Sequence, residues 1–251
     1  MELFFIFLFG LAVGSFLNVL IDRLPQGKSI RGRSYCDHCH KKLNNLDLIP
    51  IFSYLLLAGR CRFCKQKISW QYPLVEFLTG LIFIFTWVFT PFDGILKLLY
   101  LALMACLIGI FFSDLKYQLI PDEIQVAALI FSALGFFLTG GIGLVVARLL
   151  DGLLIGLPLL AVFLLTKQKG MGFGDVKLGF IMGYLLGWSS GFIALYIAFI
   201  TGALAGLMAI FLHKRKFKSK LPFGPFLVLG TVAMLIFGNL INNFMAKLFG
   251  F

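Results

Sequence analysis

The sequence predicts an all-α, polytopic membrane protein with about eight transmembrane helices. First, 60% of the 251 residues are hydrophobic and the mean hydropathy is +0.98, which is more apolar than a soluble domain of this length can hide. Second, apolar runs of bilayer length recur along the chain. Third, one polar segment, residues 22–73, interrupts these runs and contains two CxxC pairs, which predict a small cytoplasmic zinc-binding domain.

The apolar runs give the expected positions of the membrane spans. Two glycine-containing turns, TPFDG (90–94) and TGGIG (139–143), predict antiparallel helical hairpins. Residues 1–21 are expected to be a retained first span, because Glu2 replaces the basic start of a signal peptide and no A-x-A-like cleavage site follows. The expected spans are 2–21, 74–90, 95–113, 124–139, 142–166, 176–188, 190–212 and 225–248.

The distribution of basic residues predicts the orientation. If the segment 22–73 is cytoplasmic and the spans alternate, 19 of the 22 Lys and Arg residues fall on the cytoplasmic side. This bias follows the positive-inside rule, so we expect the N-terminus outside. It also accounts for the net charge of +11 without a nucleic-acid partner. The cytoplasmic segments are 22–73, 114–123, 167–177 and 213–223.

The two CxxC pairs, CDHC and CRFC, are separated by 21 residues. Two such hairpins can present four thiolates tetrahedrally, which is typical of structural zinc, and disulfides are rare on the reducing side of the membrane. His38 and His40 are spare ligands and fit better as bystanders, and Cys106 is expected to pack as a small hydrophobe. The expected zinc ligands are Cys36, Cys39, Cys61 and Cys64.

Two acidic stretches, SDLKYQLIPDE (113–123) and GMGFGDVKLG (170–179), are expected at one membrane face because two spans separate them. Taken alone, Asp122 and Asp175 are each better explained as helix N-caps. Asp114 ends an apolar run, where the helix dipole disfavours a carboxylate, and ionisable groups at membrane depth are functional candidates. Two neighbouring carboxylates would share a proton and suit an aspartyl hydrolase.

The other motifs favour no different chemistry. The sequence has no GxSxG, HExxH or Walker lysine motif, and no predicted strand precedes the glycine-rich stretch as a nucleotide loop would require. Arg148 and Asp151 are expected to pair on one helix face. Glu76 fits a helix start or a pocket at the membrane surface. The stretch HKRKFKSK (213–220) is expected to be a positive-inside anchor that attracts anionic lipid.

Together these motifs closely resemble the type IV prepilin peptidases, the prepilin leader peptidase/N-methyltransferases. The resemblance covers about residues 10 to 180. Departures are CDHC, where many members have proline after the first cysteine, AGRC for RGxC, and WQYP for RYP. The matching pieces, in family order, are GSFLNVLIDRLP (14–25), CDHC…CRFC, KISWQYPLVE (67–76), DLKYQLIPDE (114–123) and GFGDVKLG (172–179).

The resemblance implies a GxGD-type aspartyl endopeptidase in the bacterial cytoplasmic membrane. Such enzymes cleave a basic leader from prepilins and pseudopilins, usually between glycine and phenylalanine. The family's catalytic aspartates fall on Asp114 and Asp175, whereas Asp122 matches the motif without being catalytic. Bifunctional members then methylate the new N-terminal amine, so S-adenosylmethionine is the expected methyl donor beside structural zinc, although no methyltransferase motif is recognisable.

The expected organisation has four parts. They are a first transmembrane span (1–21), a cytoplasmic four-Cys zinc domain (22–73) within an N-terminal peptidase/methyltransferase region of about 10–90, a GxGD peptidase membrane core (95–212), and a basic loop with the last span (213–251). Expected partners are prepilin or pseudopilin substrates and the lipid bilayer. Two alternatives stay open: a peptidase without methyltransferase activity, and a non-enzymatic membrane scaffold whose zinc knuckles dock a partner. The scaffold leaves Asp114 unexplained.

Overall fold

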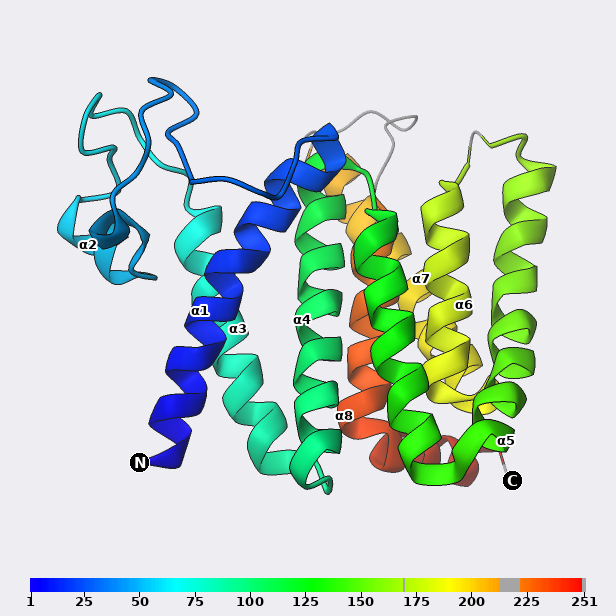
Figure 1. The fold of residues 1–251 in the computed structure, drawn as a ribbon. Helices are drawn as coiled ribbons and strands as arrows, with labels where there is room; N and C mark the ends of the chain where they lie inside the picture. Colours follow the sequence, from blue (N-terminus) through cyan, green and yellow to red (C-terminus); the bar gives the residue numbers. More distant parts are fainter. Residues whose placement is uncertain (169, 213–221, 250–251) are drawn as a thin grey trace. The chain divides into compact units, whose positions relative to one another are not determined.

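The computed structural model describes residues 1–168, 170–212 and 222–249 (Figure 1). These residues contain two isolated β-bridges and no strand, so the all-α prediction is confirmed. The basic stretch 213–220, which the sequence predicts to be a membrane anchor, lies outside them. The helices are α1 (Glu2–Arg23), η1 (Leu24–Gln26), η2 (Asn45–Leu48), α2 (Phe52–Leu56), α3 (Gln71–Phe89), α4 (Gly94–Tyr117), α5 (Asp122–Leu165), α6 (Phe173–Leu186), α7 (Trp188–Phe211) and α8 (Gly224–Phe249).

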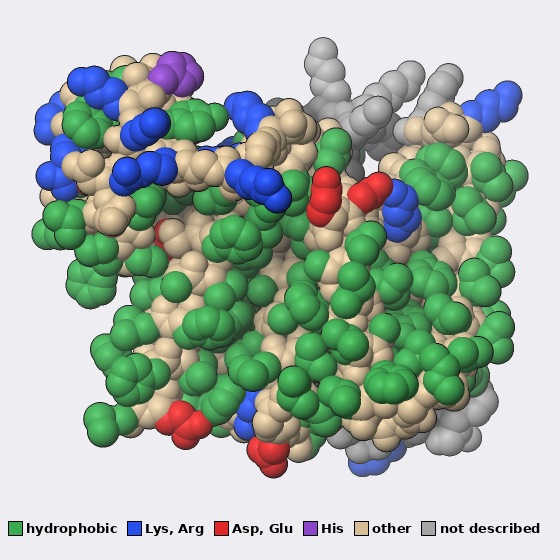
Figure 2. All heavy atoms as spheres, in the orientation of Figure 1, with side chains coloured by type: hydrophobic (Ala, Val, Ile, Leu, Met, Phe, Trp, Pro, Cys, Tyr) green, Lys and Arg blue, Asp and Glu red, His purple; other side chains and the backbone are tan. Residues whose placement is uncertain are grey.

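Long apolar helices make the chain a multi-pass membrane protein. Five helices of the described residues, α1, α3, α4, α5 and α7, are long and apolar enough to cross a bilayer. The α6 helix has only 14 residues, which agrees with the short sixth span expected from the sequence. Figure 2 shows hydrophobic side chains over the sides of the helices, and Lys and Arg side chains gathered over the cysteine-containing segment.

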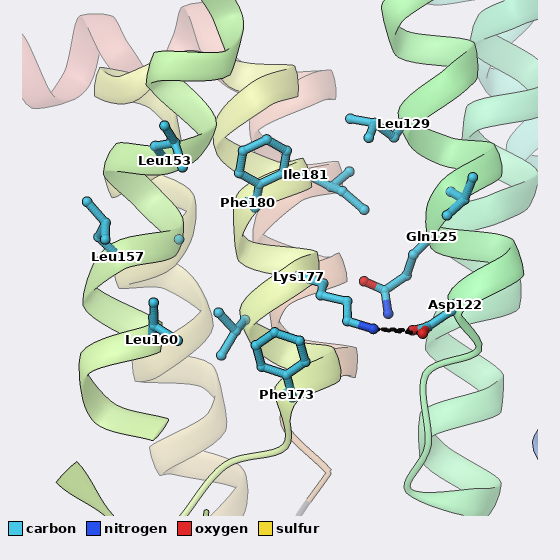
Figure 3. Close-up of a pocket in the computed structure, with 13 residues that line it drawn as sticks. Asp122, Gln125, Leu129, Leu153, Leu157, Leu160, Phe173, Lys177, Phe180 and Ile181 are labelled. Atoms are coloured by element: carbon cyan, nitrogen blue, oxygen red, sulfur yellow. Dashed lines mark hydrogen bonds and ion pairs between the residues drawn. The ribbon is translucent and has the colours of Figure 1, made fainter. Parts of the chain in front are cut away.

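The α5 helix contains two of the expected spans. Its 44 residues would extend about 66 Å at 1.5 Å per residue, about twice the hydrocarbon thickness. The helix is broken at Gly141, where φ is 67° and ψ is −167°, a conformation open to glycine. The turn predicted at 139–143 is therefore present. The first arm (122–140) and the second arm (142–165) run in opposite directions with α6 between them (Figures 1 and 3).

The chain divides into two compact units, Met1–Phe112 and Ser113–Phe251. In the first unit α1 and α3 are in direct backbone contact. A Cβ on Gly10 would lie 2.7 Å from the Cα of Gly80, and a Cβ on Gly14 would lie 2.7 Å from the Cα of Glu76. Gly10 and Gly14 form a GxxxG motif, so this is the close packing that small residues allow between membrane helices.

The second unit is also packed through glycines. A Cβ on Gly183 of α6 would lie 2.6 Å from the carbonyl oxygen of Asp151 in the second arm of α5, and a Cβ on Gly230 of α8 would collide with the backbone of Ala194 in α7. The predicted pair of Arg148 and Asp151 is confirmed, with 3.6 Å between Nη1 and Oδ2. Close packing of α6 fixes the position of its first turn, which carries Asp175.

Candidate active site

Asp114 lies in the last turn of α4 and belongs to the second unit. Its side chain is buried, and Oδ2 accepts a hydrogen bond of 3.0 Å from the backbone N–H of Gly224, the first residue of α8. The C-terminus of α4 disfavours this carboxylate, whereas the positive end of the α8 dipole favours it. The hydrogen bond from Gly224, which lies 110 residues away in the sequence, thus stabilises the Asp114 carboxylate where α4 itself does not.

Asp175 lies in the first turn of α6 and is also buried. Gly172 is the N-cap residue, and Asp175 is the third residue of the helix, so the prediction of an N-cap aspartate is wrong in register. The Asp175 Oδ2 accepts the backbone N–H of Gly172 at 3.2 Å, while the Asp175 N–H donates to the Gly172 carbonyl at 3.2 Å. The carboxylate therefore caps the helix from within its first turn.

The two aspartates come together around Ile120, which is 7% exposed. A Cβ on Gly174, next to Asp175, would lie 3.3 Å from the Ile120 Cβ, and a Cβ on Gly224 would lie 3.0 Å from its Cδ1. Asp175 is thus linked to Asp114 through the Ile120 side chain and Gly224. The end of α4 and the start of α6 therefore bring two buried carboxylates to the same side chain within one unit of the chain.

The four predicted zinc ligands also come together, in the first unit. Their Sγ atoms all lie within 4.8 Å of one another, and those of Cys36 and Cys64 are 3.8 Å apart. Each CxxC pair sits on the same backbone turn: the first cysteine donates its N–H to the carbonyl of the fifth residue on, at 3.0 Å to Lys41 and 2.8 Å to Gln66. The group could hold a metal ion, and it includes neither His38 nor His40.

The pKa values of Cys61 and Cys64 are shifted in opposite directions. The backbone N–H of Cys64 lowers the pKa of the Cys61 thiol to about 7, against the effect of burial. The backbone N–H of Gln66 lowers the pKa of the Cys64 thiol, but burial and the neighbouring sulfur atoms outweigh this effect and raise it to about 11. Thiolates this close repel one another, and a bound cation would remove that repulsion.

Comparison with known proteins decides the family. Residues 8–90 match the Bacterial Peptidase A24 N-terminal domain, and residues 101–207 match the Type IV leader peptidase family. The chain belongs to the type IV leader peptidase family. No solved structure matches it.

Relatives of this leader peptidase family cover nearly the whole chain. The Prepilin leader peptidase/N-methyltransferase of Aeromonas hydrophila is 34% identical over 268 residues, which is 95% of this chain and 91% of that protein. The protein of the same name from Burkholderia pseudomallei (strain K96243) is 32% identical over 270 residues, covering 95% and 86%. That from Bacillus subtilis (strain 168) is 32% identical over 252 residues, covering 97% of each. The resemblance seen in the sequence is confirmed, as is the prediction of an enzyme.

Two contacts of this type IV leader peptidase were not foreseen from its sequence. Gly224 is the partner of Asp114, and the available local signal was only the following proline, which is common at the start of a helix. Asp122 was expected to be an N-cap, but it is the first residue of α5 after Pro121 and makes no cap bond. Instead both its oxygens accept from the Lys177 Nζ, at 2.6 and 2.7 Å, which joins α5 to α6.

Glu76 of α3 makes a backbone contact that neither interpretation of its place in the sequence predicted. Its side chain is buried in α3, and Oε2 accepts the backbone N–H of Ile51 at 2.8 Å. Ile51 has a φ of 61°, which is rare for a β-branched residue. The Glu76 carboxylate therefore holds the start of α2, within the segment between the two cysteine pairs, in an unusual backbone conformation.

Proposed function

We propose that the chain is a membrane aspartyl endopeptidase that removes the basic leader from type IV prepilins or pseudopilins, with Asp114 and Asp175 as its catalytic pair. The observation that supports this most is the pair itself: two buried carboxylates grouped around Ile120, each fixed by a glycine N–H at a helix start. The relatives' name, prepilin leader peptidase/N-methyltransferase, supplies the substrate class.

The proposed chemistry uses the two carboxyl groups as one pair. Two carboxyl groups at short range share one proton, because both cannot ionise together. The ionised aspartate takes a proton from water, and the water oxygen attacks the scissile carbonyl carbon. The protonated aspartate gives its proton to the amide nitrogen as the C–N bond breaks, so the pair again holds one proton. Since the glycine N–H groups occupy Oδ2 of Asp114 and of Asp175, we assign Oδ1 of each to water and substrate.

We place this reaction at the cytoplasmic face of the bacterial membrane. Asp114 lies at the end of one apolar helix and Asp175 at the start of another, which suits a reaction near the membrane surface. A substrate with a basic leader and an apolar helix has its scissile bond at that depth. The sequence supports this orientation, because alternating spans with the N-terminus outside would put 19 of the 22 basic residues on the cytoplasmic side.

We further infer that the four-Cys group holds a structural Zn²⁺. Tetrahedral Zn–S bonds of about 2.3 Å put the sulfur atoms about 3.8 Å apart, and the Cys36 and Cys64 sulfurs are 3.8 Å apart. Four protein ligands leave no coordination position for water, so the ion would stabilise the fold of the segment 22–73. When bound, S-adenosylmethionine would supply a methyl group to the new N-terminal amine, as the relatives' name implies.

The deciding experiment is cleavage of a prepilin peptide by the purified full chain in detergent, followed by mass spectrometry. Wild type should release the leader, and Asp114→Asn should not. Asp93→Asn is the matched control, because Asp93 is fully exposed and lies outside the pair. Full cleavage by Asp114→Asn would remove this residue from the mechanism.

The same samples separate the alternatives. With S-adenosylmethionine present, a bifunctional enzyme adds a methyl group to the mature N-terminus, whereas a peptidase alone leaves the amine unmodified. A non-enzymatic scaffold would produce neither product. The scaffold explains the cysteines but gives no reason for two buried aspartates grouped around Ile120.

A further inference from the structure

A groove of about 450 Å³ lies between α6 and the two arms of α5, within the second unit (Figure 3). Its walls are almost entirely apolar and include Leu129, Leu157 and Phe180. Side chains along its rim are half exposed, with Leu157 at 53% and Val126 at 54%. A groove that opens between membrane helices can receive an apolar chain from the side.

One residue of the groove is polar and unsatisfied. Gln125 lines it and is 2% exposed, and neither its Nε2 nor its Oε1 has a hydrogen-bond partner among the described residues. Figure 3 shows its side chain directed from α5 toward α6, close to the ion pair of Asp122 and Lys177. Buried amides in native proteins are normally hydrogen-bonded, so this one calls for a ligand that both donates and accepts.

The groove reaches the first turn of α6, the turn that also carries Asp175. Val176 and Lys177, which follow Asp175 directly, both line it. Asp175 itself is not part of the lining, so a chain that reaches its carboxylate at the start of α6 lies within one helical turn, about 5.4 Å, of the groove. The Asp122–Lys177 pair neutralises the charge at this end, which suits an uncharged segment.

We propose that this groove binds the apolar segment of the polypeptide substrate next to its scissile bond, and that Gln125 hydrogen-bonds one of its peptide groups. The inference rests on the proposed peptidase function and adds a binding site to it. A peptide bond must leave its helix to be cut, and this frees N–H and C=O groups that find no partner in lipid. The Gln125 amide has a donor nitrogen and an acceptor oxygen, which match the C=O and N–H of a peptide group and have no counterpart in a lipid acyl chain.

The first test is kinetic and uses the full chain with its aspartates intact. Gln125→Leu keeps the side-chain size but cannot hydrogen-bond. We expect kcat/KM for a prepilin peptide to fall about tenfold, mostly through KM, the size of effect expected for one hydrogen bond made in both substrate complex and transition state. Thermal stability should be unchanged or higher, because the variant removes a buried unsatisfied amide. Ser132→Ala, on the same arm but bonded to its own helix, is the control.

The second test locates the substrate. A photoreactive residue, Leu157→p-benzoyl-phenylalanine, is placed in the inactive Asp175→Asn background and irradiated with prepilin peptide in vesicles. Leu150, on the same arm, 65% exposed and not part of the groove, is the control position. We expect cross-links to the apolar part of the peptide from position 157 and not from position 150.

The outcomes are separable. If wild type does not cleave, the proposed function fails. If wild type cleaves while Gln125→Leu keeps its kcat/KM, or positions 157 and 150 cross-link the peptide equally, the groove inference alone is overturned. Cross-linking from position 157 to phospholipid and not to peptide would also overturn it, because the groove would then be a lipid site.

Discussion

Replacing Gly224 by alanine tests how the Asp114 carboxylate is held. The new Cβ would lie 2.7 Å from the Asp114 Oδ2 and 3.0 Å from the Ile120 Cδ1. Since ordinary contact begins at 3.4 Å, the carboxylate or the start of α8 must move by about 0.7 Å. That movement breaks or lengthens the 3.0 Å bond from the Gly224 N–H, a charge-assisted bond worth about 1.5–3 kcal/mol. Because the misplacement affects the reacting group, we expect kcat to fall about 10- to 100-fold.

The assay is steady-state cleavage of a prepilin peptide in detergent, with kcat and KM measured separately. KM should change little, since Gly224 contacts Asp114 and is not part of the groove. Gly206→Ala in α7 is the matched control, because a Cβ there meets nothing within 4 Å. The reasoning is refuted if Gly224→Ala keeps wild-type kcat while folding normally.

Three other predictions concern the supporting structure. Cys36→Ser should lower zinc content from about one per chain and destabilise the first unit, which metal analysis and thermal unfolding would detect; full zinc retention would contradict it. Glu76→Gln should unfold near the wild-type temperature, because the amide carbonyl still accepts from the Ile51 N–H. Glu76→Leu should cost about 1–3 kcal/mol of stability, because it leaves that N–H without a partner. Equal melting temperatures of the two variants would argue against a role of Glu76 in holding Ile51. Lys177→Met removes an exposed ion pair with Asp122 and should cost under about 1 kcal/mol of stability. Because the pair joins α5 to α6, we expect kcat/KM to fall by more than this loss of stability corresponds to. An unchanged kcat/KM would limit the pair to surface charge.

The helices could be predicted well because apolar runs and turn glycines are local signals. The expected spans and the turn at 139–143 all have counterparts among the described helices and the break at Gly141. The even number of crossings predicted only that the two acidic stretches share one side, whereas their contact comes from the packing of Gly174 on Ile120. The four-Cys cluster followed from spacing alone, since CxxC pairs form one recurrent turn.

The missed features depend on contacts between distant parts of the chain. Gly224 lies 110 residues from Asp114, and nothing local in FGPF identifies the carboxylate it meets. The proline before a helical run favours Asp122 as an N-cap. In the structure Asp122 pairs instead with Lys177, which lies 55 residues away. Local propensity describes a helix start, and tertiary partners decide what its side chain binds.

The central claim is that Asp114 and Asp175 act as one unit on water. Its most direct test is the rate of prepilin-peptide cleavage by Asp114→Asn, Asp175→Asn and the double variant. Residues that act as a unit lose nearly all activity when either is removed, so both single variants should fall to the same background as the double variant. A single variant that keeps substantial activity, or losses that add up in the double variant, would contradict the account.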